Sequence, residues 1–226
     1  MQFNPINLLM PHYCCSCGAI GAILCEYCKY DIVSEPFAHC IVCLGIAPAS
    51  GNLCKSCAAP YSRAWCVGNR SDALECLINA YKFDRVGAAG EVFAQLLDAT
   101  LPQLPAGTVV TYVPTIPSHI RQRGYDHAAH IAKKFAKTRG LRYSSALARA
   151  EFTHQRGSGR AERIANAKRA FLGHDVDPDA TYLLIDDIYT TGATLHYASK
   201  TLLDAGASEV FIAVVARQPL EKSTDI

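Results

Sequence analysis

The sequence predicts an α/β domain built on a parallel sheet and preceded by a small cysteine-rich module. Apolar stretches of strand length alternate with segments of helical period between residues 63 and 216. Residues 182–186 form a continuous apolar run, which is typical of a strand buried on both faces of a parallel sheet. Four closely spaced cysteine pairs precede residue 60. We therefore expect a cysteine module over 1–60, an α/β domain over 61–217 and a polar tail over 218–226.

The expected elements of the α/β domain follow in chain order. Ser71 is a candidate cap for a helix that runs to Phe83, where Lys82 ends it. Pro114 and Pro117 make a stiff connection after a β-branched run. In order, the predicted elements are a strand over 63–68, helices over 71–83 and 88–100, a strand over 108–113, a helix over 126–139, a strand over 182–186, a helix over 192–205 and a strand over 209–216. Ligands in such sheets lie at the carboxyl ends of the strands.

The cysteine pairs all have two residues between the thiols, a spacing that aims both sulfurs at one tetrahedral ion. They are Cys14/Cys17, Cys25/Cys28, Cys40/Cys43 and Cys54/Cys57. The pairs predict two structural zinc ions, each held by four thiolates in a ribbon-like module. Short spacers favour two consecutive groups over a cross-braced arrangement, which stays open.

We also make predictions for several other residues in and around the cysteine module. Gly18 and Gly45 suit a positive φ in the turns after the first pair of each group. Cys15 could replace Cys14 as a ligand, although its spacing to Cys17 is short for the turn. Outside the module, we expect Cys66 and Cys76 to be buried thiols.

The composition places the chain in the cytoplasm. Half of the 226 residues are apolar, yet no apolar run approaches the length of a membrane span. Met1–Met10 lacks the pattern of a secretory signal, so the cysteines are interpreted as metal thiolates in a reducing cytosol.

The net charge of +2 is unevenly distributed along the chain. Most of the basic residues lie between Ile120 and Ala170, where acidic residues are few. Such an excess indicates an anionic partner, either a pyrophosphate or a nucleic acid. For Lys133, Lys134 and Lys137 a solvated helix face is the favoured interpretation.

The strand at 182–186 ends in a candidate phosphate site. Asp186 and Asp187 can reach sugar hydroxyls or a magnesium ion. The start of the next helix offers backbone N–H groups and threonine hydroxyls to a phosphate. This loop consists of Thr190, Thr191, Gly192, Ala193 and Thr194. The alternative is a buried strand with an Asp helix cap, but a cap requires only one Asp.

The stretch from Tyr182 to Leu195 resembles the signature of type I phosphoribosyltransferases, which bind phosphoribosyl pyrophosphate (PRPP). The resemblance implies a type I phosphoribosyltransferase-like sheet that binds PRPP with Mg²⁺. It also implies that Asp186 and Asp187 contact the ribose and that the following loop binds the 5′-phosphate.

With its cysteine module, the whole chain resembles the ComF family, also called the GntX-like family. Further matching segments are Val113-Pro114-Thr115-Ile116-Pro117 and Arg123-Gly124-Tyr125-Asp126-His127. Asp126-His127 departs from the family's Asn-Gln, and Tyr125 from its Phe. Candidate pyrophosphate ligands are Arg121, Arg123, Arg160 and Arg163, because arginine offers a planar fork to phosphate oxygens.

The resemblance to the ComF family implies a role in natural competence, in which the protein acts with a helicase on incoming single-stranded DNA. Tyr125 and Tyr143 could then stack on bases. The alternative is a true phosphoribosyltransferase for an unidentified base or amine. The sequence leaves the choice and the oligomeric state open.

Overall fold

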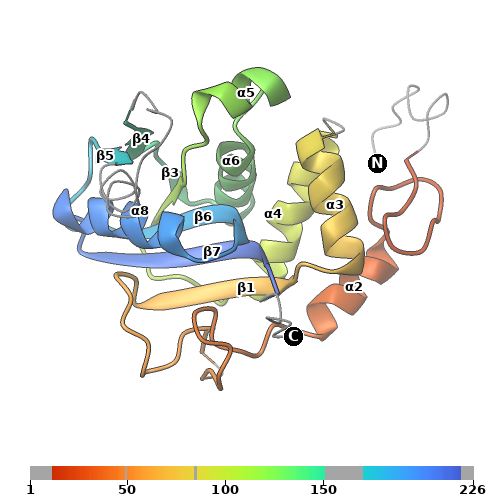
Figure 1. The fold of residues 1–226 in the computed structure, drawn as a ribbon, viewed down its shortest axis with the longest axis horizontal. Coiled ribbons are helices and arrows are strands. Elements are labelled where there is room, and N and C mark those ends of the chain that lie inside the picture. Colours follow the sequence, from red (N-terminus) through yellow and green to blue (C-terminus); the bar gives the residue numbers. More distant parts are fainter. Residues whose placement is uncertain (1–11, 49, 84–85, 151–169, 220–226) are drawn as a thin grey trace, which may run out of the picture.

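The computed structural model describes residues 12–48, 50–83, 86–150 and 170–219. Its core is a parallel sheet in the order β1-β7-β6-β2-β3 (Figure 1). The strands of this sheet are β1 (Arg63–Asn69), β2 (Val109–Tyr112), β3 (Arg142–Tyr143), β6 (Thr181–Tyr189) and β7 (Glu209–Arg217). A second sheet pairs β4 (Leu147–Arg149) and β5 (Phe171–Gly173) in antiparallel fashion. The predicted class, a parallel α/β sheet preceded by a cysteine-rich module, is confirmed.

The helices divide between the two faces of the sheet. They are α2 (Glu26–Ser34), α3 (Asp72–Phe83), α4 (Ala88–Thr100), α5 (Pro117–Arg123), α6 (His127–Arg139) and α8 (Ala193–Asp204). Along β6, Leu183 and Ile185 join an apolar cluster with α3, α4 and α6, whereas Tyr182 and Leu184 join a cluster with α8. Burial on both faces explains why this strand is a continuous apolar run.

The predicted end of the central strand at Asp186 is wrong. β6 continues to Tyr189 because its ladder with β7 extends through the pairs Ile188–Ala216 and Tyr189–Arg217. Asp187 therefore lies within the strand, as Asp186 does, rather than after it. Gln218 also remains attached to the sheet, because its N–H donates to the carbonyl of Tyr189 at 2.8 Å. The rest of the expected polar tail, 220–226, lies outside the described residues.

The segment that contains the second cysteine group covers the outer edge of β1 (Figure 1). Asn52 makes the junction, because its N–H donates to Ala64 O at 2.7 Å and its side-chain oxygen accepts from the N–H of Cys66 at 2.9 Å. An uncovered edge strand is a template for association with other chains. The segment therefore completes the sheet as well as carrying four cysteines.

Three details of the cysteine residues and their surroundings differ from expectation. A helix, α2, begins directly after Cys25, where a ribbon alone was expected. The turn after Cys43 places its positive φ at Leu44 (61°) rather than at Gly45, in the position where the first turn has Gly18 (74°). Cys76 is exposed on α3, whereas Cys66 is buried as predicted.

Candidate functional site

Asp186 and Asp187 lie side by side at the carboxyl end of β6. The Oδ1 atom of Asp186 accepts a hydrogen bond from the N–H of Asp187 at 2.8 Å. Burial, and secondarily the negative charge of Asp187, raises the pKa of Asp186 to about 8. In the free protein near neutral pH, Asp186 is therefore mostly protonated, and a bound cation would favour its ionised form.

Lys82, at the end of α3, is a site residue that the sequence did not reveal. Its Nζ lies 2.6 Å from Oδ2 of Asp187, and both side chains are mostly buried. The same lysine lines a cavity with Phe83, Gln122 and Arg123. Lys82 therefore connects a predicted sugar-binding carboxylate with a cavity that carries two positive charges.

The expected phosphate loop precedes α8, and most of it faces solvent. Thr190, Thr191, Ala193 and Thr194 are exposed. Gly192 is the N-cap of α8 and adopts the left-handed conformation with φ 77°. Only glycine takes this conformation without cost, and the hydroxyl of Thr191 accepts from the N–H of Ala193 at 3.4 Å. The loop thus presents a helix start and three hydroxyls at the same sheet edge as the two acids.

Asp126 fixes the loop that follows β2. Its carboxylate accepts from the N–H of Thr115 at 2.9 Å and from the Thr115 hydroxyl at 3.0 Å. It also caps α6 by accepting from the N–H of Ala129 at 3.2 Å. An acid at this position is thus used for positioning, because one carboxylate serves both the loop and the helix.

Tyr125 and His127 both bind the backbone next to Lys82. The Tyr125 hydroxyl donates to the carbonyl of Tyr81 at 3.1 Å, and Nε2 of His127 donates to the same oxygen at 3.0 Å. Burial lowers the pKa of His127, which keeps the ring neutral. The segment that departs from the ComF pattern therefore holds the end of α3, and with it Lys82, beside Asp187.

The predicted pyrophosphate arginines are only partly brought to the site. The guanidinium of Arg123 lies over the ring of Phe83, 6.0 Å from its centroid, and lines the Lys82 cavity. Arg121 is exposed on α5. Arg149, which is not one of these candidates, lies at the carboxyl ends of the strands, where its Nε donates to Pro114 O at 3.2 Å. Arg160 and Arg163 lie outside the described residues.

The eight predicted zinc ligands form two consecutive groups, as the short spacers favoured. The groups are Cys14, Cys17, Cys25 and Cys28, and Cys40, Cys43, Cys54 and Cys57; within each, the sulfurs lie within 4.8 Å of one another. The Sγ–Sγ separation is 3.7 Å for Cys17–Cys25, 3.8 Å for Cys40–Cys57 and 3.7 Å for Cys43–Cys54. Four sulfurs about 2.3 Å from one ion have tetrahedral edges of roughly 3.8 Å. The donor atoms and their spacing therefore fit structural zinc.

Each of the two cysteine groups contains a turn of the same kind. In each group the first cysteine accepts a backbone N–H at its sulfur, from Cys25 to Cys14 and from Cys54 to Cys40, both at 3.4 Å. Each turn is closed by an isolated antiparallel bridge, Tyr13–Ile20 in the first group and His39–Ile46 in the second. N–H groups that point at sulfur favour the thiolate form that a metal requires.

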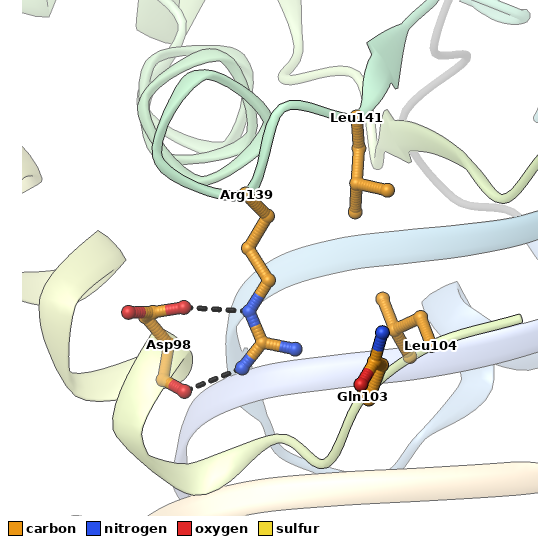
Figure 2. A pocket seen from close by; sticks show the side chains of 5 residues that line it. All are labelled: Asp98, Gln103, Leu104, Arg139 and Leu141. Carbon is orange, nitrogen blue, oxygen red and sulfur yellow. Dashed lines mark hydrogen bonds and ion pairs between the residues drawn. The ribbon is translucent and has the colours of Figure 1, made fainter. Parts of the chain in front are cut away.

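A cavity near the amino ends of β2 and β3 is structural (Figure 2). Arg139 of α6 donates there to the Asp98 carboxylate at 2.5 Å and to the carbonyl of Leu101 at 2.7 Å. The guanidinium thus binds the C-terminal end of α4. Because its donors are used in this way and the cavity lies near the amino ends of β2 and β3, it is no candidate ligand site.

Some basic residues in the described part of this segment form ion pairs within the protein. Lys134 pairs with Glu91 at 2.9 Å, which agrees with the expected helix face, and Arg142 pairs with Asp177. The two tyrosines expected to stack on bases are packed instead, Tyr125 against Tyr81 and Tyr143 in parallel on Tyr112. Exposed tyrosines lie in the cysteine module, at Tyr13, Tyr27 and Tyr30.

Comparisons with known proteins place the chain beside competence proteins. Competence protein ComFC of Streptococcus pneumoniae is 30% identical over 140 residues, which cover 62% of this chain and 61% of that protein. Competence protein F of Haemophilus influenzae is 28% identical over 208 residues, covering 86% of this chain and 90% of that protein. No family model matches the chain. The expected resemblance to ComF-type competence proteins is thus confirmed, although the chain spans about three fifths of the first relative.

Solved structures that resemble the chain include those of an allosteric enzyme and of a phosphoribosyltransferase. The allosteric regulatory enzyme of purine biosynthesis has a TM-score of 0.39 and 20% identity, covering 55% of this chain and 24% of that one. A hypoxanthine phosphoribosyltransferase of Staphylococcus aureus has a TM-score of 0.35 and 16% identity, covering 68% of this chain and 69% of that one. Among the helices that the structure describes, none combines the length and apolar character needed to cross a bilayer.

Proposed function

We propose that this chain binds Mg²⁺ and PRPP at the carboxyl edge of its sheet and acts in natural competence on incoming single-stranded DNA. The observation that carries the PRPP part is the placement of Asp186 and Asp187 near the end of β6, which leads through a short loop to a left-handed Gly192 at the start of α8. Two carboxylates suit the ribose hydroxyls, and the helix start suits the 5′-phosphate.

Magnesium fits the donor set, because carboxylate oxygens are ligands that it prefers. When bound, it would neutralise charge on the pyrophosphate. The chain's own cations provide a second source of positive charge, since Lys82 and Arg123 line one cavity. Ligand hydroxyls would replace Lys82 at Asp187, and the freed ammonium group would then face the pyrophosphate.

Thermal unfolding with a series of ligands tests this assignment. A ligand present at a hundred times its dissociation constant stabilises a protein by about 2.7 kcal/mol. PRPP with Mg²⁺ should raise the unfolding temperature most, ribose 5-phosphate and pyrophosphate each less. A zinc-loaded protein that none of the three ligands stabilises would contradict the proposal.

The DNA part of the proposal is supported by exposed tyrosine rings on the cysteine module. Tyr27 and Tyr30 lie three residues apart on α2 and are 73% and 72% exposed, so both are available for stacking. Replacing both by alanine should weaken the binding of single-stranded oligonucleotides, whereas replacing the packed Tyr143 by phenylalanine should not. Binding that does not weaken with added salt would argue against a nucleic-acid partner.

A transferase reaction is the second candidate, and the acidic pair favours it, because carboxylates beside the ribose would stabilise positive charge that develops at C1. Pyrophosphate release from PRPP that requires an added base or amine would support turnover. Tight PRPP binding without release, across a panel of acceptors, would leave PRPP as a bound regulator.

A further inference from the structure

Arg217, the last residue of β7, is 1% exposed, and among the described residues it forms no ion pair. Its Nε donates to the carbonyl of Ile41 at 2.7 Å, and its Nη1 donates to that of Gln218 at 2.6 Å. Its guanidinium lies over the ring of Tyr189, 5.6 Å from the centroid. A buried guanidinium is costly unless its donors are bonded, so Arg217 fixes Ile41 and Tyr189 relative to each other.

Tyr189 lies directly beneath the phosphate loop. The residue is 4% exposed, and a Cβ at Gly192 would overlap the Tyr189 phenol. The backbone of the loop therefore rests on this ring without a side chain between them. The ring is thus in direct contact with the start of α8 and supports it.

Ile41 belongs to the second cysteine group, since it lies between the ligands Cys40 and Cys43. It is fully buried, and its N–H donates to the carbonyl of Asn52 at 2.7 Å. Ile41, Tyr189 and Leu195 of α8 share one apolar cluster. The path from the cysteine group to the loop thus consists of one turn, one arginine and one tyrosine ring.

The first cysteine group packs on the other face of the sheet. Cys14 and Cys28 belong to the cluster that contains α3, α4 and α6. Lys29 of α2 donates to the side chain of Gln95 on α4 at 2.7 Å. The first group has the same kind of turn as the second group. Its contacts are with α4 and the other face of the sheet, and not with the phosphate loop.

We infer that Arg217 and Tyr189 are positioning residues that make the shape of the phosphate loop depend on the metal state of the second cysteine group. Loss of its metal would release Ile41 and then Arg217, whereas loss of the first metal would not. The ligand-binding consequence rests on the proposed function, but the mechanical coupling does not.

Hydrogen exchange at the start of α8 tests the coupling without any ligand. Cys17→Ser and Cys43→Ser form a matched pair, because each removes an exposed second cysteine from its group. The reporter is the amide of His196, which donates to the carbonyl of Gly192 at 2.8 Å. Cys43→Ser should speed its exchange by about tenfold or more, and Cys17→Ser by less than about twofold, because only the second group touches the support of the loop. Equal effects of the two variants, or none, would overturn the inference.

Arg217→Met separates this path from a general loss of stability. Methionine keeps much of the side-chain volume but removes the donors, so the amide of His196 should exchange faster in this variant with both zinc ions retained. Adding Cys43→Ser should then accelerate this exchange little further, because residues in one path are not additive. Fully additive effects would show that Arg217 does not transmit the change.

Ligand binding provides a readout that distinguishes failure of the inference from failure of the proposed function. If the wild type binds ribose 5-phosphate and pyrophosphate, Arg217→Met should weaken ribose 5-phosphate by about tenfold and pyrophosphate far less, because only the 5′-phosphate needs the loop. Equal weakening of both ligands would contradict a positioning role. If the wild type binds neither ligand, the proposed function fails while the exchange experiment still decides the coupling.

Discussion

The Nζ atom of Lys82 lies 2.6 Å from Oδ2 of Asp187, so the end of α3 and the end of β6 meet through a mostly buried ion pair. The pair occupies a carboxylate that the sequence assigns to a sugar. It also neutralises one of two adjacent acids, which lowers the cost of placing them together. In the free protein, Lys82 therefore occupies the carboxylate that the sequence predicts as a ribose contact.

Removing the lysine should leave Asp187 partly buried beside Asp186 without a counter-charge. We expect Lys82→Met to lower the free energy of unfolding by about 1–3 kcal/mol, the cost of an unsatisfied buried group. Chemical denaturation measures this change. In Asp187→Asn the same substitution should cost much less, and an equal cost in both backgrounds would contradict the pairing.

The raised pKa of Asp186 predicts a pH dependence of stability in the metal-free site. Between the ordinary pKa near 3.8 and about 8, the unfolded chain is ionised at this residue and the folded chain is not. Ionisation thus favours unfolding, and stability decreases as pH rises, by at most about 1.4 kcal/mol per pH unit. Asp186→Asn should therefore stabilise the protein more near pH 8 than near pH 5. A gain that does not change with pH would contradict this assignment.

His127 should have the opposite pH dependence, because burial lowers its pKa below 6.5. Its contribution to stability is present above pH 6.5 and is lost as pH falls, since the unfolded chain takes up the proton first. His127→Gln keeps a donor for the carbonyl of Tyr81 and removes the titration. We expect this variant to lose less stability than the wild type between about pH 7.5 and 5.5. Identical acid profiles would argue against a neutral buried ring.

Asp126 should be needed both for helix α6 and for the loop at Thr115. Asp126→Ala should lower the free energy of unfolding by about 1–2 kcal/mol, as expected for a lost N-cap. Asp126→Asn retains one acceptor oxygen and should cost less. Hydrogen exchange at Thr115 and Ala129 checks both contacts, and a variant that changes only one of them would limit the role of Asp126 to that contact.

Local sequence patterns predicted β1, β2, β6 and β7 and the helices α3, α4, α6 and α8, because apolar period and turn residues act over short distances. They missed α5 and the short strands β3, β4 and β5. The pattern at residues 182–194 placed both acids and the loop at one edge, since it is a single continuous segment. It could not show that β6 continues to Tyr189, because that depends on pairing with β7. The positive φ at Leu44 was also missed, because the conformation of this turn is set by the cysteines on either side of it.

Lys82 and Arg217 could not be found from the sequence. Lys82 is a common last-turn residue of a helix, and only the clamp of Tyr125 and His127 on Tyr81 brings it to Asp187. Arg217 ends a strand that is far along the chain from Ile41, whose backbone carbonyl it binds. Long-range contacts of this kind leave no local periodicity.

The most direct test of the central claim is calorimetric titration of PRPP with Mg²⁺ into the zinc-loaded protein. It should be run on the wild type, on the double variant Asp186→Asn/Asp187→Asn, and on Asp204→Asn, which removes an exposed acid of α8. We predict one binding site in the wild type and in Asp204→Asn, and its loss in the double variant. Failure of the wild type to bind, or unchanged binding by the double variant, would contradict the site.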